Sequence, residues 1–153
     1  MHAPSSTIHA VVTGLVSVMQ RVLDPTEVPV YDGFPSGEFP RTRGLVVVGV
    51  APGDTVPIVA QESPMGLGDR ADEDITVRSW LSVQDPAAPD FTLLRSSAVG
   101  VLSQIDEALR ADPTLGGACD YCSLSGRVGI YPARTTEAAV IDVMFEIDAK
   151  AYL

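Results

Sequence analysis

Two cysteines, two histidines and one acidic run are the residues of this chain whose types and spacing favour chemistry. Cys119 and Cys122 enclose two residues, which is the spacing of a redox pair or of half a zinc site. A zinc site needs further ligands, but no second cysteine pair follows, and His2 and His9 lie at the far end of the chain. A redox pair normally lies at a helix N-terminus, whereas residues 118–124 have the composition of a strand, which points the two thiols to opposite faces. We therefore expect two ordinary thiols, buried or half-buried.

The acidic run offers oxygen ligands of the kind that hard cations prefer. It lacks the spacing and the turn glycine of a calcium loop, so the sequence favours a solvated, charged loop that binds no metal. The members of the run are Asp69, Asp72, Glu73 and Asp74.

Other patterns typical of enzymes do not occur in the sequence. Gly66 and Gly68 are not followed by Lys and Ser or Thr at the spacing of a phosphate-binding loop, and there is no G-x-S-x-G elbow. Because both histidines lie in the N-terminal segment, a serine or cysteine nucleophile lacks its usual base. We expect a protein that is not an enzyme and that uses no cofactor.

The charge of the chain argues against tight binding of nucleic acid. Its 153 residues, enough for a single domain spanning 1–153, include 20 acidic and 10 basic residues and carry a net charge of −10. The basic residues are spread singly, so no patch grips a duplex, although this charge is compatible with DNA that slides past. No apolar run has the length of a membrane span, and residues 8–23 are amphipathic rather than uniformly apolar as in a secretory signal. We expect a soluble protein, made in the cytoplasm, with no membrane partner.

Helical periodicity and strand alternation divide the chain into elements. Apolar residues recur at helical spacing over about 7–23 and from 90 or 91 to 110. Residues 75–83 and 139–149 alternate between an apolar face and a more polar one, as strands do. Shorter strands are predicted at 28–31, 45–50, 118–124 and 128–131. The stretch 51–74, which is rich in glycine and proline, is predicted to be a long loop.

The order of these elements predicts the fold class. It reads helix, strand, strand, strand, helix, strand, strand, which is typical of an α+β two-layer sandwich. We expect one mainly antiparallel or mixed sheet of four or five strands, with both helices on one face. The apolar faces of the helices and of the two alternating strands would form the core.

Four segments of the chain resemble tail terminator (tail completion) proteins of long-tailed actinobacterial phages. "EALRADPTLGG" (107–117) is similar to the end of their second helix, and "VPVYDGFP" (28–35) to their first strand and its turn. "GLGDRADEDITVRSWLSVQ" (66–84) resembles their long loop and third strand. "RTTEAAVIDVMFEIDAKAYL" (134–153) resembles their last strand. The segments follow the order of the family and span nearly the whole chain.

The resemblance implies a structural role in the virion. Tail terminators form a ring, typically a homohexamer, at the head-proximal end of the tail tube. The ring stops tube polymerisation and joins the tail to the head–tail connector or stopper protein, and genomic DNA passes through its lumen without specific binding. The resemblance also implies the α+β sandwich, and a location in the neck of the virion at the head–tail junction.

Within such a ring, the long loop suggests an assembly element. A ring subunit has two unlike side surfaces, and an arm between two strands can reach a neighbour, the tube or the lumen. We hypothesise that residues 64–74 are an arm that becomes ordered on assembly. Its candidate contact residues are Met65, Leu67, Asp69, Arg70, Asp72, Glu73 and Asp74. A plain surface loop remains the alternative.

The net charge permits two further interpretations, and two other classes of protein stay open. An acidic lumen would repel the DNA backbone, but acidic residues serve solubility equally well. Another neck component of the virion, such as a head-completion or stopper protein, has a similar size. A small acidic α+β ligand-binding or regulatory domain is the alternative from a different class.

Overall fold

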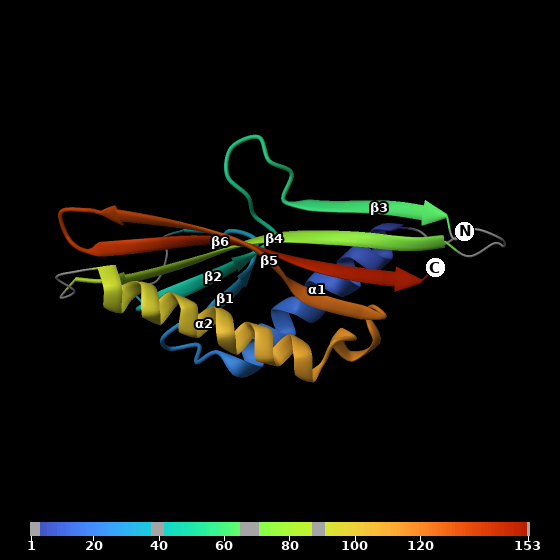
Figure 1. The fold of residues 1–153 in the computed structure, drawn as a ribbon, viewed down its shortest axis with the longest axis horizontal. Coiled ribbons are helices and arrows are strands. Elements are labelled where there is room, and N and C mark those ends of the chain that lie inside the picture. The colour runs from blue at the N-terminus through green and yellow to red at the C-terminus, as the bar shows by residue number, and fades with distance from the viewer. Residues whose placement is uncertain (1–3, 38–41, 65–70, 87–90, 153) are drawn as a thin grey trace.

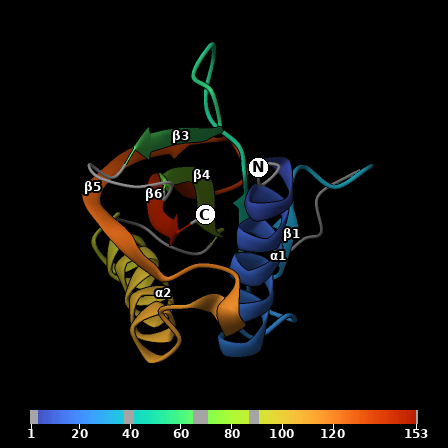
Figure 2. The ribbon, with the colours of Figure 1, turned by 90° about the vertical axis from the view of Figure 1, so that its right-hand side faces the viewer.

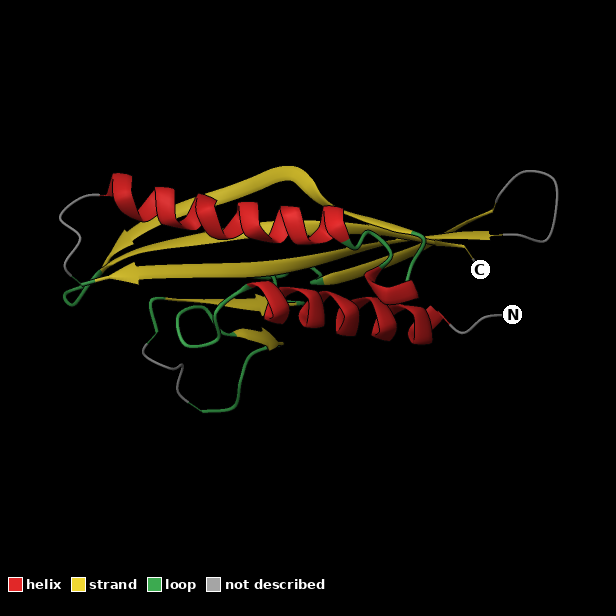
Figure 3. Ribbon diagram, turned by 90° about the horizontal axis from the view of Figure 1, so that it is seen from below, coloured by secondary structure: helices red, strands yellow, loops and turns green. Residues whose placement is uncertain are grey.

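The computed structural model describes residues 4–37, 42–64, 71–86 and 91–152. The protein has two layers, a six-stranded mixed sheet and two α-helices that lie on the same face of it (Figure 1). Figure 3 views the molecule from the helix side, with both helices in front of the strands. The predicted α+β class and the one-sided helix layer are confirmed, and the sheet has one or two strands more than predicted.

The elements follow the predicted order with one strand added before the second helix. The helices and the short 3-10 turn are α1 (Pro4–Val22), α2 (Phe91–Ala111) and η1 (Leu115–Gly117). The strands are β1 (Val30–Asp32), β2 (Gly44–Val48), β3 (Ile58–Pro64), β4 (Ala71–Asp85), β5 (Tyr121–Arg134) and β6 (Ala139–Tyr152).

Strand β4 organises the sheet because it pairs with three others. The strand order is β1-β2-β4-β6-β5, and every pairing is antiparallel except that of β1 with β2. On one side β4 pairs with β6 along its described length. On the other side it pairs first with β3, along residues 71–77, and then with β2, along residues 79–83. Strands β2 and β3 thus share one edge of β4, and residues 49–57 leave the sheet between them.

Two predictions about this region were wrong. The predicted loop 51–74 contains strand β3, and β4 begins at Ala71, so the acidic residues Asp72, Glu73 and Asp74 lie in a strand rather than in an arm. The segment 58–64 has no regular alternation, so its strand structure comes from pairing with β4 rather than from its own pattern.

The two short strands predicted at 118–124 and 128–131 are one continuous strand, β5. A bulge between Leu124 and Val128 in the pairing with β6 takes up the Ser125-Gly126 segment, which resembled a turn in the sequence. A bulge adds residues to one strand without ending the pairing, and a sequence pattern does not separate it from a turn.

The core lies between the helices and the apolar faces of β4 and β6. The alternation predicted for both strands is confirmed, since Ile75, Val77, Leu81 and Val83 of β4 are buried together with the apolar positions of β6. The helix stripes are also buried, apart from Ile8 and Phe91, which are partly buried, and Val22, which is 42% exposed. The largest fully buried side chains are Phe145, Leu15, Met19, Ile75, Leu81, Ile105, Leu109, Ile141 and Ile147.

The segment Ala111–Gly117 forms a tight reversal that follows α2 and packs against α1. Leu115, Gly116 and Gly117 all have positive φ angles, of 52°, 70° and 96°. The Asp112 carboxylate accepts a hydrogen bond from the Gly116 amide at 3.1 Å and forms an ion pair with Arg21 of α1 at 3.5 Å. The reversal places Leu115 against Gly14 of α1, where a Cβ atom would lie 2.9 Å from the Leu115 Cβ. Because Gly14 has no side chain, Leu115 can pack directly on α1, and this contact, called the Leu115 wedge below, holds α1 against the end of α2.

Gly14→Ala is predicted to destabilise the protein although alanine favours a helix. The added methyl group meets Leu115, whose left-handed backbone gives it little room to retreat, so we expect a net loss of about 1–2 kcal/mol of unfolding free energy. Gly100→Ala in α2 is the matched control. Its Cβ meets no atom within 4 Å, and it should stabilise by about 0.5–1 kcal/mol. Urea denaturation measures the unfolding free energy of both variants. If both substitutions change it by the same amount in the same direction, the proposed contact of Leu115 with Gly14 is wrong.

Candidate functional site

The sequence-predicted contact residues do not form one site. Met65, Leu67, Asp69 and Arg70 lie outside the described residues, so their role stays a prediction. Successive residues of a strand point to opposite faces, so Glu73 is buried toward the helix layer while Asp72 and Asp74 lie on the other face. Both of these aspartates are ion-paired with Lys150 of β6, at 3.6 and 3.9 Å. Among the described residues, no group of three or more His, Cys, Asp or Glu is placed to hold a metal ion.

The face of the sheet away from the helices carries a ladder of polar pairs between β4 and β6. The Thr76 hydroxyl donates to Asp148 at 3.0 Å, Arg78 Nε to Glu146 at 3.1 Å, and Trp80 Nε1 to Asp142 at 3.1 Å. With the Lys150 ion pairs, these contacts run along both strands. The opposite face of the same strands is apolar, so a register shift by one residue would bury the charges. The ladder and the core therefore specify one alignment of β4 and β6.

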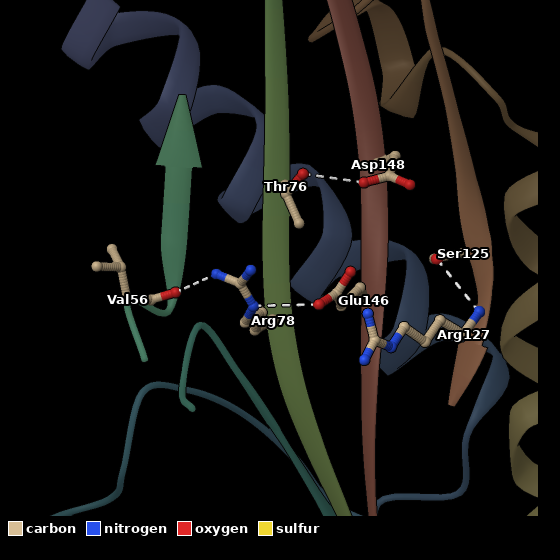
Figure 4. A network of polar contacts seen from close by, with 7 residues as sticks. All are labelled: Val56, Thr76, Arg78, Ser125, Arg127, Glu146 and Asp148. Atoms are coloured by element: carbon tan, nitrogen blue, oxygen red, sulfur yellow. Dashed lines mark hydrogen bonds and ion pairs between the residues drawn. The ribbon is translucent and has the colours of Figure 1, made fainter. Parts of the chain in front are cut away.

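Arg78 lies at the centre of this ladder and also holds the segment that leaves the sheet. Residues 49–57, called the 49–57 loop below, rise from the helix-free face between β2 and β3 (Figure 1). One guanidinium nitrogen of Arg78 donates to the Val56 carbonyl, while Nε binds Glu146 (Figure 4). The Arg78 carbonyl accepts hydrogen bonds from the amides of Gly49 and Val50 at 2.9 and 3.0 Å. One residue thus fixes both ends of the loop.

Sequence reasoning missed this loop as a separate feature because it merged it with β3. The available signal was its pair of glycines, Gly49 and Gly53, which have φ angles of 78° and 58° and allow the backbone to turn out of the sheet. The tip is solvent-exposed, and the Val56 side chain is 57% exposed. A projecting loop with a fixed base and an exposed apolar side chain is suited to contact another molecule.

A small aromatic cluster lies beside the loop on the same face. Leu45, Val47 and Val50 are buried there beneath Tyr31 and Trp80. Phe34, which is 63% exposed, packs its ring against Trp80 with 6.1 Å between the ring centroids. A shallow groove of about 1060 Å³ extends from Trp80 toward the turn between β5 and β6.

A second groove lies on another side of the molecule, between α2 and β5. It has a volume of about 560 Å³ and is lined by Phe91, Arg95, Ile130, Pro132, Ala133, Arg134 and Ile141. The Arg134 guanidinium lies over the Phe91 ring, 5.2 Å from its centroid. An apolar floor with two arginines suits an apolar side chain next to an acidic one.

The two cysteines are placed differently from the prediction. Both are buried as expected, but Cys119 precedes β5 rather than lying within it, so the thiols do not point to opposite faces and instead hydrogen-bond to each other. The Cys119 sulfur in turn donates to the Pro113 carbonyl at 3.7 Å. This arrangement lowers the pKa of Cys119, mainly through the hydrogen bond from Cys122, and raises the pKa of Cys122. The Cys119 thiol therefore contacts the Ala111–Gly117 reversal, and both thiols belong to the main core cluster.

Comparison with known proteins finds similarity to solved structures. No protein-family model matches the chain. No curated protein matches it either. Among solved structures, the chain is similar to one in the "Virion of native gene transfer agent (GTA) particle", with a TM-score of 0.29 and 17% identity over 96% of this chain and 93% of that one. The superposition is too loose for the fold or the role of that chain to be transferred. In the described part of the chain, no helix is long and apolar enough to cross a membrane.

Arg78→Lys is predicted to loosen the 49–57 loop while the sheet persists. A lysine ammonium keeps the charge but does not span Glu146 and the Val56 carbonyl with the fixed fork of a guanidinium. We expect about tenfold faster hydrogen exchange at the Thr55 amide, with little change in β6. Arg127→Lys, on neighbouring β5 and drawn in the same view (Figure 4), is the control. Unchanged exchange in Arg78→Lys would show that the loop is held by other contacts.

Proposed function

We propose that this protein is a tail terminator, a structural virion protein whose ring caps the head-proximal end of the phage tail tube. In this role it stops tube polymerisation and joins the tail to the head–tail connector. Its partners are further copies of itself, the tail-tube protein and the connector or stopper protein. We propose a structural rather than a catalytic role because the groups capable of chemistry are engaged within the fold, the two thiols with each other and Asp72 with Lys150.

The observation that carries the proposal is where the family-like segments lie in the fold. The segment 66–84 supplies most of β4 and 134–153 supplies β6, and these two strands pair along their lengths. The segment 107–117 supplies the end of α2 and the reversal that wedges Leu115 against α1. Three of the four segments that resemble the family therefore build the centre of the molecule, while 28–35 supplies the edge strand β1. The α+β sandwich to which they belong is the fold that the resemblance implies.

The shape of the sheet supports assembly into a ring. Strands β3 and β5 flank the central pair β4 and β6 on opposite sides, so the two sides of a subunit are unlike. Unlike surfaces that meet between copies give a heterologous contact, which generates a closed ring when the rotation closes.

The helix-free face is the surface that best suits a DNA-filled lumen. Asp74, Asp142, Glu146 and Asp148 lie on it, and acidic residues outnumber the basic residues Arg78, Arg127 and Lys150 there. A mildly acidic wall repels phosphates and lets DNA slide. A ring structure with a basic bore would contradict this part of the proposal.

Electron microscopy of the protein mixed with tail tubes tests the proposal. Purified protein is added to tubes assembled from the tail-tube protein of the same phage, and negatively stained ends are counted. We expect caps at one end of each tube, and shorter tubes when the protein is present during polymerisation. An unrelated acidic protein of the same size serves as the control. If tubes remain uncapped, the terminator assignment is wrong, and binding to the portal instead would identify a head-side neck protein.

A further inference from the structure

The two sides of the molecule that flank the central strand pair differ in charge. The 49–57 loop and β3, residues 49–64, contain the acidic residues Asp54 and Glu62 and no lysine or arginine. Among the residues that the structure describes, the groove between α2 and β5 is lined by Arg95 and Arg134 and by no acidic residue. In a chain with a net charge of −10, a groove whose described charged residues are both arginines is a local exception. Figure 2 shows that the 49–57 loop projects away from α2 and β5, the two elements that line the groove, so one copy presents both surfaces at once.

The tip of the 49–57 loop is preorganised, and its exposed side chains are available to bind another molecule. The amide of Thr55 donates to the Pro52 carbonyl at 3.2 Å, which closes a turn around Asp54, and Arg78 holds the Val56 carbonyl. Asp54 is exposed and has no hydrogen bond or ion pair with any residue that the structure describes. A loop fixed in this way loses little conformational entropy on binding.

The groove offers the complementary chemistry. Its apolar floor includes Ile130, which is 40% exposed, and Phe91. Arg95 is exposed on the rim and is not paired with any described residue, whereas Arg134 lies against the Phe91 ring. A carboxylate placed between these two guanidinium groups forms charge-assisted hydrogen bonds, and a neighbouring apolar side chain covers the floor.

We propose that the turn 52–56 of one copy docks in the α2–β5 groove of the next copy. Asp54 lies between Arg95 and Arg134, and Val56 covers Ile130 and Phe91. Because the turn and the groove are different surfaces, each copy donates one turn and accepts another, and the contact repeats around a ring. This inference deepens the proposed function, on which it rests for the ring, by naming the contact that holds the ring together.

A charge-swap experiment tests the contact. Asp54→Arg reverses the charge of the turn, and the double variant Arg95→Glu with Arg134→Glu reverses the charge of the groove. All three residues are exposed, so we expect the fold to persist in both variants. Sedimentation velocity over a concentration series measures self-association of each variant. We expect wild-type protein to associate and each variant alone to associate at least about tenfold more weakly. An equimolar mixture of the two variants should recover association, because each turn then meets a groove of opposite charge.

Controls distinguish the loss of this contact from an effect of net charge and from a failure of the proposed function. Glu107→Arg changes the charge as much as Asp54→Arg does, but on the exposed side of α2 outside the groove, and it should associate like wild type. Variants that associate like wild type, or a mixture that does not recover, overturn the contact. If wild-type protein and Asp54→Arg both cap tail tubes as equal rings, the contact is wrong while the terminator function stands. If wild-type protein neither associates nor caps tubes, both are wrong.

Discussion

The antiparallel pairing of β4 with β6 is the constraint on which the other elements depend. It runs from Asp72 opposite Tyr152 to Asp85 opposite Ala139, with an apolar face that packs on the helices and a polar face that carries the ladder of ion pairs and hydrogen bonds. The two faces act together, because a shift by one residue would bury the charges and expose the core. With that register fixed, three further strands have one place to bind, β5 along β6 and β2 and β3 along the free edge of β4, and β1 then pairs with β2.

The surface features relevant to function follow from that arrangement. Because β2 and β3 share one edge of β4, the chain between them has to leave the sheet, and Arg78, a ladder residue, fixes the 49–57 loop where it leaves. Because β5 ends beside the start of α2, a groove with two arginines forms on another side of the molecule. The same pairing that builds the core thus creates two unlike surfaces, which is the requirement for a ring of identical subunits.

Much of the fold is predictable from the sequence because its central elements have strong periodicity. The alternation of 75–83 and 139–149 and the helix stripes specify the core and the two layers. Strand β3 is not predictable in this way, since an edge strand without alternation depends on its partner, and neither is the bulge in β5. The predicted arm at 64–74 overlaps β4 at residues 71–74, because proline and glycine mark a loop without showing which part of it pairs with the sheet, and residues 65–70 lie outside the described residues. Arg78 holds two segments at once, and Arg95 and Arg134 meet in one groove, only because distant parts of the chain pack together. Single arginines in a sequence do not indicate such contacts.

A cryo-electron microscopy reconstruction of a capped tube end tests the central claim most directly, because it shows the ring and its contacts in one measurement. The account predicts a closed ring of identical subunits in which the 49–57 loop of each copy enters the α2–β5 groove of its neighbour, with the helix-free faces toward the lumen. A ring in which like surfaces of two copies meet, or one in which the loop does not enter the α2–β5 groove of a neighbour, would contradict it.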